Sequence, residues 1–580
     1  MNIWLGYLNE ALIIGMFALS VNVLIGYSGI LSIAGVATGG VAGYLAGYLS
    51  AMHGWAFLPC LFVGIGAGAL IGILLSLPAL RLSAEYVLML TLAFASVIVS
   101  ALVAIPALGG QNGLLGIMPV HIGGKILLRP DELLEFIVPL TAICFLACWR
   151  IIYSPFGRVL KGIREEPDAV RALGKNVLSY QVIAFAASSA VAAVGGVALV
   201  FYNQLASPTL FDFNVATLVI AIAVIGGLGN LWGSMVGALL LVSLQPILEK
   251  IVDVNPSSAV LWQAIVYGLL LLVIVRLRPE GLIPERASWR GLRSALARSR
   301  RKASPAEAIA PVAVAPSLPS QNGNAAAGVS LKAHGLEKHF GGITAVSDLD
   351  IELSPGMITA LVGPNGAGKT TVFNLLTGQI PPDRGEVELG GASVSGLPPH
   401  RVVARGMARS FQDVRTFTRM TVLENVMLAV GEQTGESLPA LFVRPLAVRR
   451  RERQVREWAL ECLGFVGLSE QADERAGNLG YGSQKLLAVA RLLATGCDVL
   501  LIDEPASGID REALEPVMLV MERLRASGKT ICLVEHNLEV VTRLADHVLF
   551  IEDGKVTETG TMDDIRKQPR LATVYFGHHG

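Results

Sequence analysis

Long apolar runs without charged residues dominate the chain before residue 286. The candidate membrane spans are 11–26, 31–49, 55–77, 87–107, 133–149, 181–201, 215–248 and 259–275. No charged residue lies between Glu10 and Arg81, and between Lys175 and Glu249 only Asp212 is charged. A charge at the bilayer centre costs about 2.5–3.5 kcal/mol, so this pattern predicts a polytopic α-helical membrane domain. It argues against a proton- or ion-coupled carrier, which usually needs intramembrane carboxylates.

The loop after the fifth run is rich in basic residues, and the positive-inside rule places it in the cytoplasm. Its basic residues are Arg150, Arg158, Lys161, Arg164, Arg171 and Lys175. Arg276 and Arg278 place the end of the last run on the same side, so the chain crosses an even number of times in between. Only three runs lie there. Residues 215–248 exceed the ~20 residues of one span and contain GGLGN at 226–230, which predicts a break: two short crossings or a re-entrant pair. The alternative is one long tilted helix, but it would give an odd number of crossings between the two cytoplasmic ends.

Glycines recur at every fourth position in three places. They are Gly35, Gly39, Gly43 and Gly47, then Gly64, Gly68 and Gly72, then Gly229, Gly233 and Gly237. Each series leaves a smooth stripe on one helix face, which allows close helix–helix approach. We favour packing over direct substrate contact for these stripes. With the breaks, the fold class is a glycine-rich membrane domain of about 8–10 spans with broken or re-entrant helices.

The composition changes after residue 285. Residues 286–302 are Arg-rich and amphipathic, which suits the anionic cytoplasmic leaflet, and 303–328 are Ala/Pro/Ser-rich with little to bury. Residues 329–580 have ordinary soluble composition. The predicted domains are therefore a membrane domain at 1–285, a flexible linker at 286–328 and a soluble domain at 329–580.

Net charge and cysteine usage exclude some classes of function. The formal net charge is +0, which argues against a general nucleic-acid binder. The six cysteines lack paired metal spacing, and we interpret them as reduced, buried thiols. They are Cys60, Cys144, Cys148, Cys462, Cys497 and Cys532.

Residues 363–370 read GPNGAGKT and fit the phosphate-binding loop GxxxxGK[ST] at every fixed position. The loop follows the apolar run 358–362 and leads into a helical pattern, the context that the motif requires. Backbone N–H groups and the helix start would cradle a polyphosphate, Lys369 would reach its terminal phosphates, and Thr370 would ligate Mg²⁺. The predicted nucleotide-binding residues here are Gly363, Asn365, Gly366, Ala367, Gly368, Lys369, Thr370 and Thr371.

A second apolar run, 498–505, ends in two carboxylates. Asp503 suits an indirect ligand of Mg²⁺, acting behind the groups that touch the ion, and Glu504 suits the group that polarises the attacking water. Apolar strands with acids at the end are common, so the pattern gains weight from its place downstream of the phosphate loop and upstream of His536, which follows another apolar run, 531–535.

The stretch LGYGSQ, which precedes a helical pattern, resembles the LSGGQ signature of ABC ATPases. Its residues are Leu479, Gly480, Tyr481, Gly482, Ser483 and Gln484. Gly480 stands where the family has serine and Ser483 where branched-chain systems have glutamine, while Gly482 and the helix start keep backbone donors for a phosphate. In this family each ATP site pairs one subunit's phosphate loop with the other's signature. The resemblance therefore implies that the ATP site which this signature completes on the partner subunit is a weaker one.

The resemblance to ABC ATPases covers about residues 329–577 and implies further roles. Phe340 would stack on adenine, with a buried core phenylalanine as the alternative. Gln412 matches the glutamine loop, which contacts Mg²⁺ or water. His536 stands where the switch histidine contacts the γ-phosphate, and Asp510 would communicate across a dimer. The implied catalytic set is Glu504, His536 and Gln412, and the implied metal set is Thr370, Gln412 and Asp503.

Residues 150–176 resemble the coupling loop of importer-type ABC permeases. Glu166, Ala169, Ala172 and Gly174 fit its E-x-x-A…A-x-G pattern, and a short helix there would dock into a groove on the ATPase. An ordinary solvated basic loop is the alternative. Segments 108–113, 207–208, 226–230 and 278–282 resemble the permease of branched-chain amino-acid ABC importers, a diffuse likeness that covers nearly all of residues 5–285.

These resemblances imply a permease fused to an ATPase. It would use ATP and Mg²⁺ to import branched-chain or other hydrophobic amino acids across the plasma (inner) membrane, with its multi-pass half in lipid and its ATPase in the cytoplasm. Implied partners are a second permease, a second ATP-binding subunit (homologous or another copy) and an extracytoplasmic solute-binding protein. Alternative cargoes are urea, short amides and aromatic acids. An ABC exporter of lipid or drug is disfavoured by the short, Gly-broken runs, and a tethered non-transport ATPase by the polytopic half.

Overall fold

The computed structural model describes residues 2–122, 125–251, 256–285 and 329–567, and the chain forms two compact units. The first unit comprises Met1–Arg164 and Leu178–Arg286, and the second comprises Glu165–Val177 and Ala287–Gly580. The short segment Glu165–Val177 therefore folds with the second unit, although both of its neighbours in sequence belong to the first. The predicted linker, 286–328, lies outside the described residues, as does the end of the chain after residue 567.

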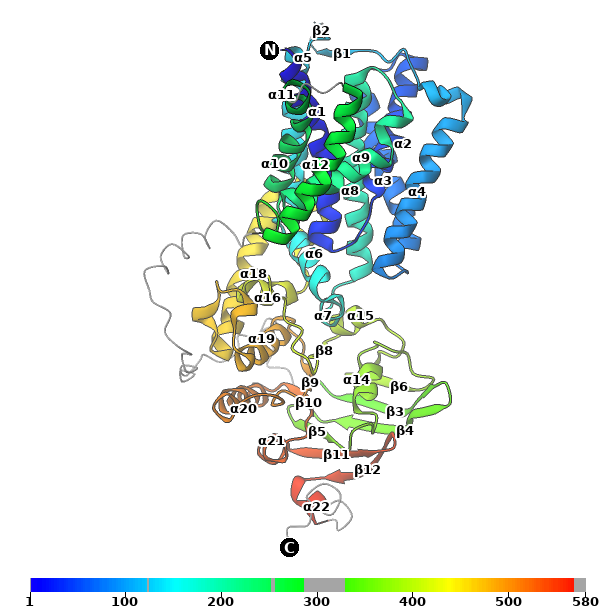
Figure 1. Ribbon diagram of the computed structural model, residues 1–580. Coiled ribbons are helices and arrows are strands. Elements are labelled where there is room, and N and C mark those ends of the chain that lie inside the picture. The colour runs from blue at the N-terminus through cyan, green and yellow to red at the C-terminus, as the bar shows by residue number, and fades with distance from the viewer. Residues whose placement is uncertain (1, 123–124, 252–255, 286–328, 568–580) are drawn as a thin grey trace, which may run out of the picture. The chain divides into compact units, whose positions relative to one another are not determined.

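The first unit is a helical bundle (Figure 1). Its helices are α1 (Asn2–Val21), the π-helical η1 (Asn22–Tyr27), α2 (Ala34–His53), α3 (Phe57–Ala79), α4 (Ala84–Ala104), α5 (Pro130–Ile152), α6 (Pro155–Glu165), α8 (Val177–Asn203), α9 (Phe213–Gly226), α10 (Leu231–Val242), α11 (Leu244–Ile251) and α12 (Pro256–Leu277). Short 3₁₀ turns (η2, Pro106–Leu108; η3, Gly110–Asn112; η4, Pro208–Phe211) and a hairpin (β1, Val120–Ile122; β2, Lys125–Leu127) connect some of them.

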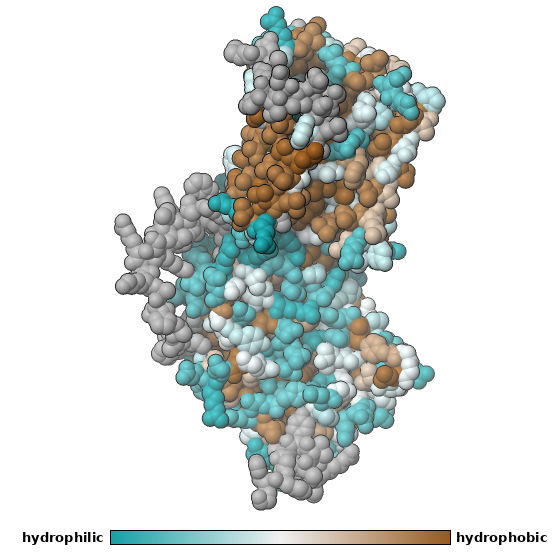
Figure 2. All heavy atoms as spheres, in the orientation of Figure 1, coloured by the Kyte–Doolittle hydropathy of each residue, from teal (hydrophilic) through white to brown (hydrophobic). Residues whose placement is uncertain are grey.

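Among the described residues, seven helical segments are long and apolar enough to cross a membrane. They are Trp4–Tyr27, Phe57–Ala79, Ala84–Ala104, Pro130–Ile152, Val177–Asn203, Pro208–Gly226 and Leu231–Leu248. Two further helices, α2 and α12, are 20 and 22 residues long. Hydrophobic residues cover the surface of this unit in Figure 2, whereas hydrophilic ones cover much of the second. The predicted polytopic helical domain is confirmed.

Glycines let α2 and α3 lie directly on the backbone of α8. A Cβ atom on Gly43 of α2 would come 2.7 Å from the carbonyl oxygen of Gly196, and one on Gly68 of α3 would come 2.8 Å from that of Ser189. Both distances are too short for any larger residue without a shift of the helices. The glycine series in these two helices therefore serve close packing, as the sequence predicted.

The predicted break in the long apolar run 215–248 lies between α9, which ends at Gly226, and α10, which begins at Leu231. Asn22, in the π-helical turn after α1, is buried and holds this break through both ends of its amide. Its Nδ2 donates to Ser234 Oγ (2.7 Å) and to the carbonyl of Asn230 (3.0 Å), and its Oδ1 accepts from the backbone N–H of Gly229 (2.8 Å). The break is thus a hydrogen-bonded structure and not a loose loop.

The end of α6 reaches the same region of the first unit. Arg164 donates from Nη1 to the carbonyl of Gly26 in η1, and its Nη2 lies 2.8 Å from Glu285 Oε2. The segment before Glu285 joins α9, because the N–H groups of Leu282 and Ile283 donate to the carbonyls of the last two α9 residues (2.8 and 3.0 Å). Arg164 therefore bonds directly to the π-helical turn. It is connected to the end of α9 indirectly, through the segment that contains Glu285.

The second unit contains two sheets (Figure 1). One has the strand order β12-β11-β5-β10-β9-β8 and is parallel except for β12, and the other, β4-β3-β6-β7, is antiparallel. The strands are β3 (Leu331–Phe340), β4 (Ile343–Leu353), β5 (Ile358–Val362), β6 (Arg384–Leu389), β7 (Ala392–Ser393), β8 (Met407–Arg409), β9 (Val499–Asp503), β10 (Thr530–Val534), β11 (His547–Glu552) and β12 (Lys555–Gly560). Apolar side chains of both sheets and of α14 form one core.

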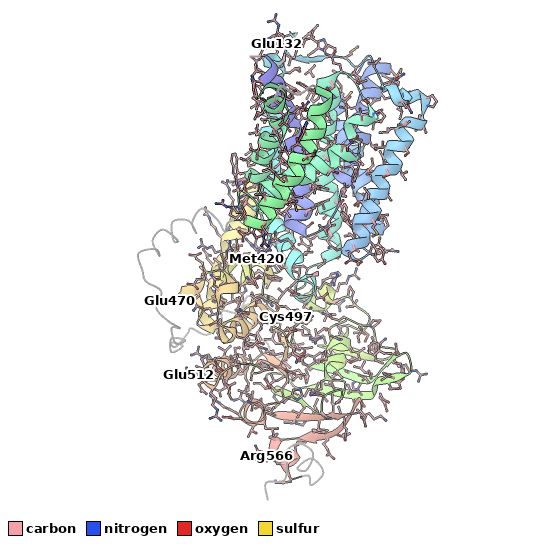
Figure 3. The ribbon with its side chains drawn as sticks, in the orientation of Figure 1. Glu132, Met420, Glu470, Cys497, Glu512 and Arg566 are labelled. Atoms are coloured by element: carbon pink, nitrogen blue, oxygen red, sulfur yellow. The ribbon has the colours of Figure 1, made fainter. Side chains whose placement is uncertain are left out.

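Helices complete the second unit. They are α7 (Pro167–Ala172), α14 (Lys369–Leu376), α15 (Pro399–Ala404), α16 (Val422–Ala429), α17 (Leu438–Val443), α18 (Pro445–Val466), α19 (Tyr481–Ala494), α20 (Arg511–Ala526), α21 (Leu538–Leu544) and α22 (Met562–Arg566). Charged residues such as Glu470 and Glu512 lie on the outside (Figure 3), while β5, β9 and β10 are buried along their whole length. Continuous apolar strands are typical of a parallel sheet covered on both faces, so functional groups gather where these strands end.

Candidate nucleotide-binding site

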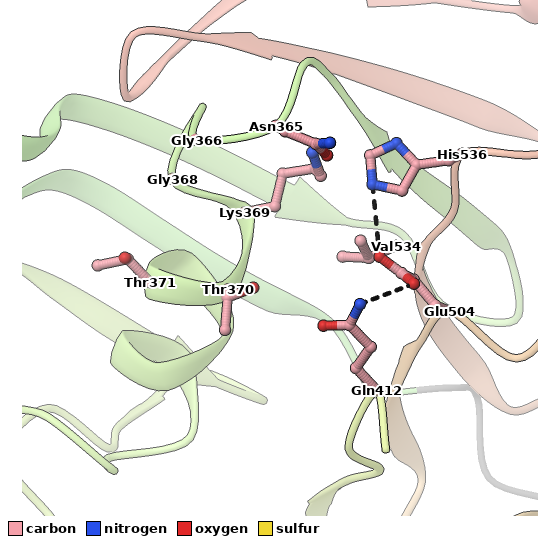
Figure 4. Close-up of a pocket in the computed structure, with 10 residues that line it drawn as sticks. All are labelled: Asn365, Gly366, Gly368, Lys369, Thr370, Thr371, Gln412, Glu504, Val534 and His536. Atoms are coloured by element: carbon pink, nitrogen blue, oxygen red, sulfur yellow. Dashed lines mark hydrogen bonds and ion pairs between the residues drawn. The ribbon is translucent and has the colours of Figure 1, made fainter. Parts of the chain in front are cut away.

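A cavity of about 260 Å³ opens at the ends of strands β5, β9 and β10. Its lining residues are Asn365, Gly366, Gly368, Lys369, Thr370, Thr371, Gln412, Glu504, Val534 and His536 (Figure 4). The predicted phosphate loop thus faces Glu504, Gln412 and His536 across one space. Gly363 and Ala367 belong to the loop but do not line the cavity. The Ala367 side chain is buried.

The phosphate loop is a tight concave turn of backbone amides. Gly366 and Gly368 have φ of +85° and +97°, and a Cβ on Gly368 would lie 2.5 Å from the carbonyl of Ala345, so glycine is required there. Lys369 is 7% exposed and its Nζ donates to the carbonyls of Gly363 and Pro364 (2.7 and 2.8 Å). Burial lowers the pKa of Lys369, and nearby carboxylates oppose this shift. A buried cation beneath oriented N–H groups suits a polyphosphate.

Glu504 is held in a strained conformation that points its carboxylate into the cavity. Its φ of +46° is left-handed, which costs roughly 1–3 kcal/mol for a non-glycine residue. Its backbone N–H donates to the carbonyl of Val534 (2.9 Å). Gln412 Nε2 donates to Glu504 Oε2 (2.9 Å), and His536 Nε2 lies 3.4 Å from Oε1 (Figure 4). The predicted catalytic set therefore meets at one carboxylate.

Surrounding groups shift the pKa of the His536 imidazole. Burial and the positive charge of Lys369 lower the pKa of His536 below its ordinary value of 6.5, and the charges of Glu504 and Asp503 only partly oppose them. Its Nε2 lies 3.4 Å from a carboxylate oxygen of Glu504, whose charge favours the protonated ring while burial favours the neutral one.

Asp503 lies behind the cavity. It forms an ion pair with Arg409 (Nη2 to Oδ2, 3.0 Å) in which both side chains are 3% exposed, and its backbone N–H donates to Ser410 Oγ (3.0 Å). Burial raises the pKa of the Asp503 carboxyl, and Arg409 opposes that shift. This placement agrees with the interpretation of Asp503 as a residue acting one layer behind the phosphate.

Lys485 was missed by the sequence analysis. Its Nζ donates to the carbonyls of Gln412 and Glu504 (both 2.9 Å), so one buried cation fixes the backbone at two cavity residues. Burial lowers the pKa of Lys485, while surrounding carboxylates oppose it. A lone lysine in an amphipathic helix looks like a surface residue in the sequence, and only the fold turns this one inward.

The signature-like residues do not line this cavity. They form the start of α19, where Gln484 Nε2 donates to the carbonyl of Leu479 (3.0 Å) and Gly480 takes the N-cap position with φ −62°. Among the described residues, and apart from its own chain neighbours, no atom lies within 4 Å of a Cβ built on Gly480. Tyr481 packs against Gly508, two residues before Asp510, the N-cap residue of α20. The signature residues and Asp510, the predicted dimer contact, therefore lie near one another. Neither lines the cavity at the phosphate loop of the same chain.

Phe340 ends β3 and is 49% exposed, so the alternative of a buried core phenylalanine is wrong. Its ring lies 5.8 Å from Lys338 Nζ and is not part of the cavity lining. An exposed aromatic face is what stacking on a base requires, and the predicted contact with adenine stays a prediction.

The segment between α6 and α8 is bonded to the strand-to-helix connection that carries Gln412. Glu165 Oε2 accepts from Thr418 Oγ1 and from the N–H of Arg419 (both 3.1 Å), and Asp168 Oδ2 pairs with Arg415 Nη1 (3.2 Å). Only two residues lie between Gln412 and Arg415. The cavity and this segment therefore contact the same short stretch of chain, 412–419.

The predicted short helix exists as α7, with Glu166 at the N-cap position, and its small residues are buried. Ala169 is 2% and Ala172 6% exposed, and Ala172 lines a small groove beside α15. Gly174 has φ +85°, and a Cβ there would lie 2.8 Å from Val403. Lys175 Nζ donates to the carbonyl of Val430 (2.7 Å) and to Glu436. The alternative of an ordinary solvated loop is therefore wrong for this segment.

Comparisons with known proteins agree with both halves. Residues 3–275 match the family described as the branched-chain amino acid transport system / permease component, and residues 346–507 match the ABC transporter family. The high-affinity branched-chain amino acid transport ATP-binding proteins BraF of Pseudomonas aeruginosa and LivG of Escherichia coli K12 are 36% and 37% identical over 248 residues, which are 43% of this chain and 97% of each. A nucleotide-free ATP-binding cassette from an ABC transporter aligns over 43% of this chain and 100% of its own, with 29% identity and a TM-score of 0.38.

The second half is an ABC ATPase, and it hydrolyses ATP to drive a polytopic membrane half. The chain belongs to the family of branched-chain amino acid ABC transport proteins, with the permease and the ATP-binding protein in one polypeptide.

Proposed function

We propose that this chain imports branched-chain or other hydrophobic amino acids across the plasma (inner) membrane, with ATP hydrolysed on the cytoplasmic side. One observation carries the proposal: the segment Glu165–Val177, which lies between two helices of the membrane half, folds as part of the ATPase unit. The segment resembles the coupling loop of importers, and the names of BraF and LivG support the cargo. The proposed domain limits are 1–285, 286–328 and 329–580.

We assign the site residues as follows. The loop amides and Lys369 bind the phosphates, and Glu504 orients and polarises the attacking water. Gln412 fixes one oxygen of Glu504, and His536 Nε2 lies 3.4 Å from the other. Phosphoryl transfer needs positioning and charge stabilisation more than covalent help, which this arrangement supplies.

The residues present fit a magnesium ion. The Thr370 hydroxyl and the Gln412 amide both line the cavity, and oxygen ligands are those that Mg²⁺ prefers. Asp503 would act from behind them. Bound Mg²⁺ would neutralise charge on the β- and γ-phosphate oxygens. Among the described residues, no group of three His, Cys, Asp or Glu side chains forms a separate metal site.

Coupling would follow the chain from the cavity to the membrane half. A shift of Gln412 moves the 412–419 stretch, which holds Glu165 and Asp168. Arg164 precedes Glu165 in the same helix, and it is bonded to the π-helical turn beside the α9–α10 break. Arg164 and Glu165, neighbours in α6, thus connect the 412–419 stretch with the α9–α10 break.

The proposed complex needs more than this chain. An ABC site pairs one subunit's phosphate loop with another's signature, so we propose a second permease and ATPase, from a homologous pair or a second copy. A separate extracytoplasmic solute-binding protein would deliver the amino acid.

The test is uptake by proteoliposomes that contain the full chain with its partner subunits, loaded with ATP, with the binding protein outside. We expect accumulation of radiolabelled leucine, isoleucine or valine that stops without ATP. A panel of urea, a short amide and an aromatic acid serves as comparison. Uptake of one of these instead of the aliphatic amino acids would contradict the proposed cargo, and ATP-driven release would contradict import.

The altered signature gives a separate prediction. Gly480→Ser should raise ATP hydrolysis by roughly 10–150-fold at the site that this signature completes, because a hydrogen bond to a charged group contributes ~1.5–3 kcal/mol. The open space around Gly480 and its N-cap conformation accept serine, and the exchange changes helix stability by only a few tenths of a kcal/mol. Phosphate release measures the rate, with Gly480→Ala as the control that adds a Cβ without a hydroxyl. A rate unchanged by serine counts against the proposal that the altered signature serves a weaker ATP site.

A further inference from the structure

A cluster of exposed apolar and arginine side chains lies where α17 meets α18, in residues 442–456, which we call the basic corner. Leu446 is 78% and Val443 77% exposed, more than any other large hydrophobic side chain in the described parts of the chain, the membrane-spanning helices included. Phe442 beside them is 53% exposed. The nucleotide site does not use this surface.

The exposed charged side chains of the basic corner are all positive. Its exposed arginines are Arg444, Arg449, Arg450, Arg453 and Arg456, and no exposed Asp or Glu lies among residues 442–456. The next exposed acid along the helix is Glu457. Buried Val448 and Val455 hold α18 in the core, so the arginines are displayed on a fixed helix face.

Few residues of chain separate contacts of this part of the second unit from a membrane-spanning helix. Lys175 contacts the carbonyl of Val430 and Glu436 inside the second unit, and the ion pair with Glu436 is buried, with side-chain exposures of 4% and 16%. Two residues after Lys175 begins α8, a membrane-spanning segment. Two residues after Glu436 begins α17, whose six residues rise ~9 Å, about one Debye length at physiological salt.

We propose that the basic corner binds the anionic phospholipid surface of the membrane in which the chain is inserted, with arginines on the headgroups and Phe442, Val443 and Leu446 in the headgroup–acyl boundary. Apolar tips flanked by arginines match both parts of such a surface. Each arginine near an anionic leaflet strengthens attraction about fivefold, so five of them are sufficient to hold the ATPase unit to the lipid. The proposal concerns the lipid contact and does not depend on the cargo.

The test uses a fluorescent probe on the full-length chain. All six native cysteines are buried, so an introduced Leu446→Cys can be labelled selectively with an environment-sensitive dye. In nanodiscs that contain roughly 30% phosphatidylglycerol we expect a blue-shifted emission that brominated lipid quenches and high salt reverses. In nanodiscs of phosphatidylcholine alone the shift should be several-fold smaller. Lys555→Cys, exposed at the β11–β12 hairpin, is the matched control and should report water in both.

A second variant separates charge from folding. Arg449→Glu with Arg450→Glu in the labelled chain should abolish the lipid-dependent shift while ATP hydrolysis in detergent stays at the level of the labelled parent. Emission typical of water in both lipids would overturn the proposal. A blue shift of equal size in both lipids and in detergent would also overturn it, since a protein would then cover the corner.

Discussion

Glu504→Gln is expected to reduce ATP hydrolysis by about 10²–10⁴-fold, which corresponds to ~2.7–5.5 kcal/mol of barrier. The glutamine keeps the size of the side chain and one oxygen for the contact with Gln412, but it cannot polarise water as a carboxylate does. ATP binding should persist, because the phosphate loop and Lys369 are unchanged. Phosphate release, nucleotide binding and solute uptake measured on one preparation check all three expectations, and uptake should fall with hydrolysis.

The matched control for this prediction is Glu515→Gln. Glu515 is an exposed carboxylate of α20 whose partner is Arg543 (2.7 Å), so the exchange alters charge by the same amount outside the cavity. Exposed pairs contribute ~0–1 kcal/mol, so we expect hydrolysis within about twofold of the parent chain. Hydrolysis by Glu504→Gln within threefold of the parent would remove Glu504 from its proposed role.

Much of the fold could be predicted from local sequence patterns. The phosphate loop after β5, Asp503 and Glu504 at the end of β9, and His536 after β10 all lie within two residues of the end of a buried apolar strand, so a linear motif fixes their position. The break at 226–230 followed from length and from the side on which charges lie, and the structure confirms it between Gly226 and Leu231. Such features depend on neighbours in the chain, which a sequence displays.

Contacts between distant segments could not be predicted in this way. Lys485 contacts the Gln412 carbonyl 73 residues away, and Asn22 contacts residues more than 200 positions away. Neither has a spacing or a composition that marks it, because a lone amide or lysine reveals nothing until the fold surrounds it. The exposure of Leu446 and Val443 was hidden for the same reason, since a hydrophobic residue in a helix is usually buried.

Arg164→Lys is expected to uncouple ATP hydrolysis from transport. Arg164 reaches two acceptors at once, the carbonyl of Gly26 and the carboxylate of Glu285, and a lysine ammonium keeps the charge but lacks the planar fork that spans both. Hydrolysis should remain within about twofold, because Glu165 still holds the 412–419 stretch. Solute imported per ATP hydrolysed should fall roughly two- to thirtyfold, the range of 0.5–2 kcal/mol found for residues that carry coupling.

Arg171→Lys is the matched control, because Arg171 lies in the next helix, α7, is half-exposed and pairs at the surface with Asp168. Its ratio of transport to hydrolysis should equal that of the parent. Glu285→Gln, which removes the charge from the other end of the Arg164 contact, should lower the ratio as well, and combining it with Arg164→Lys should add little, since both break one interaction. Equal losses of hydrolysis and transport in Arg164→Lys would mean that Arg164 only supports the fold, and full additivity of the two variants would mean that they act separately.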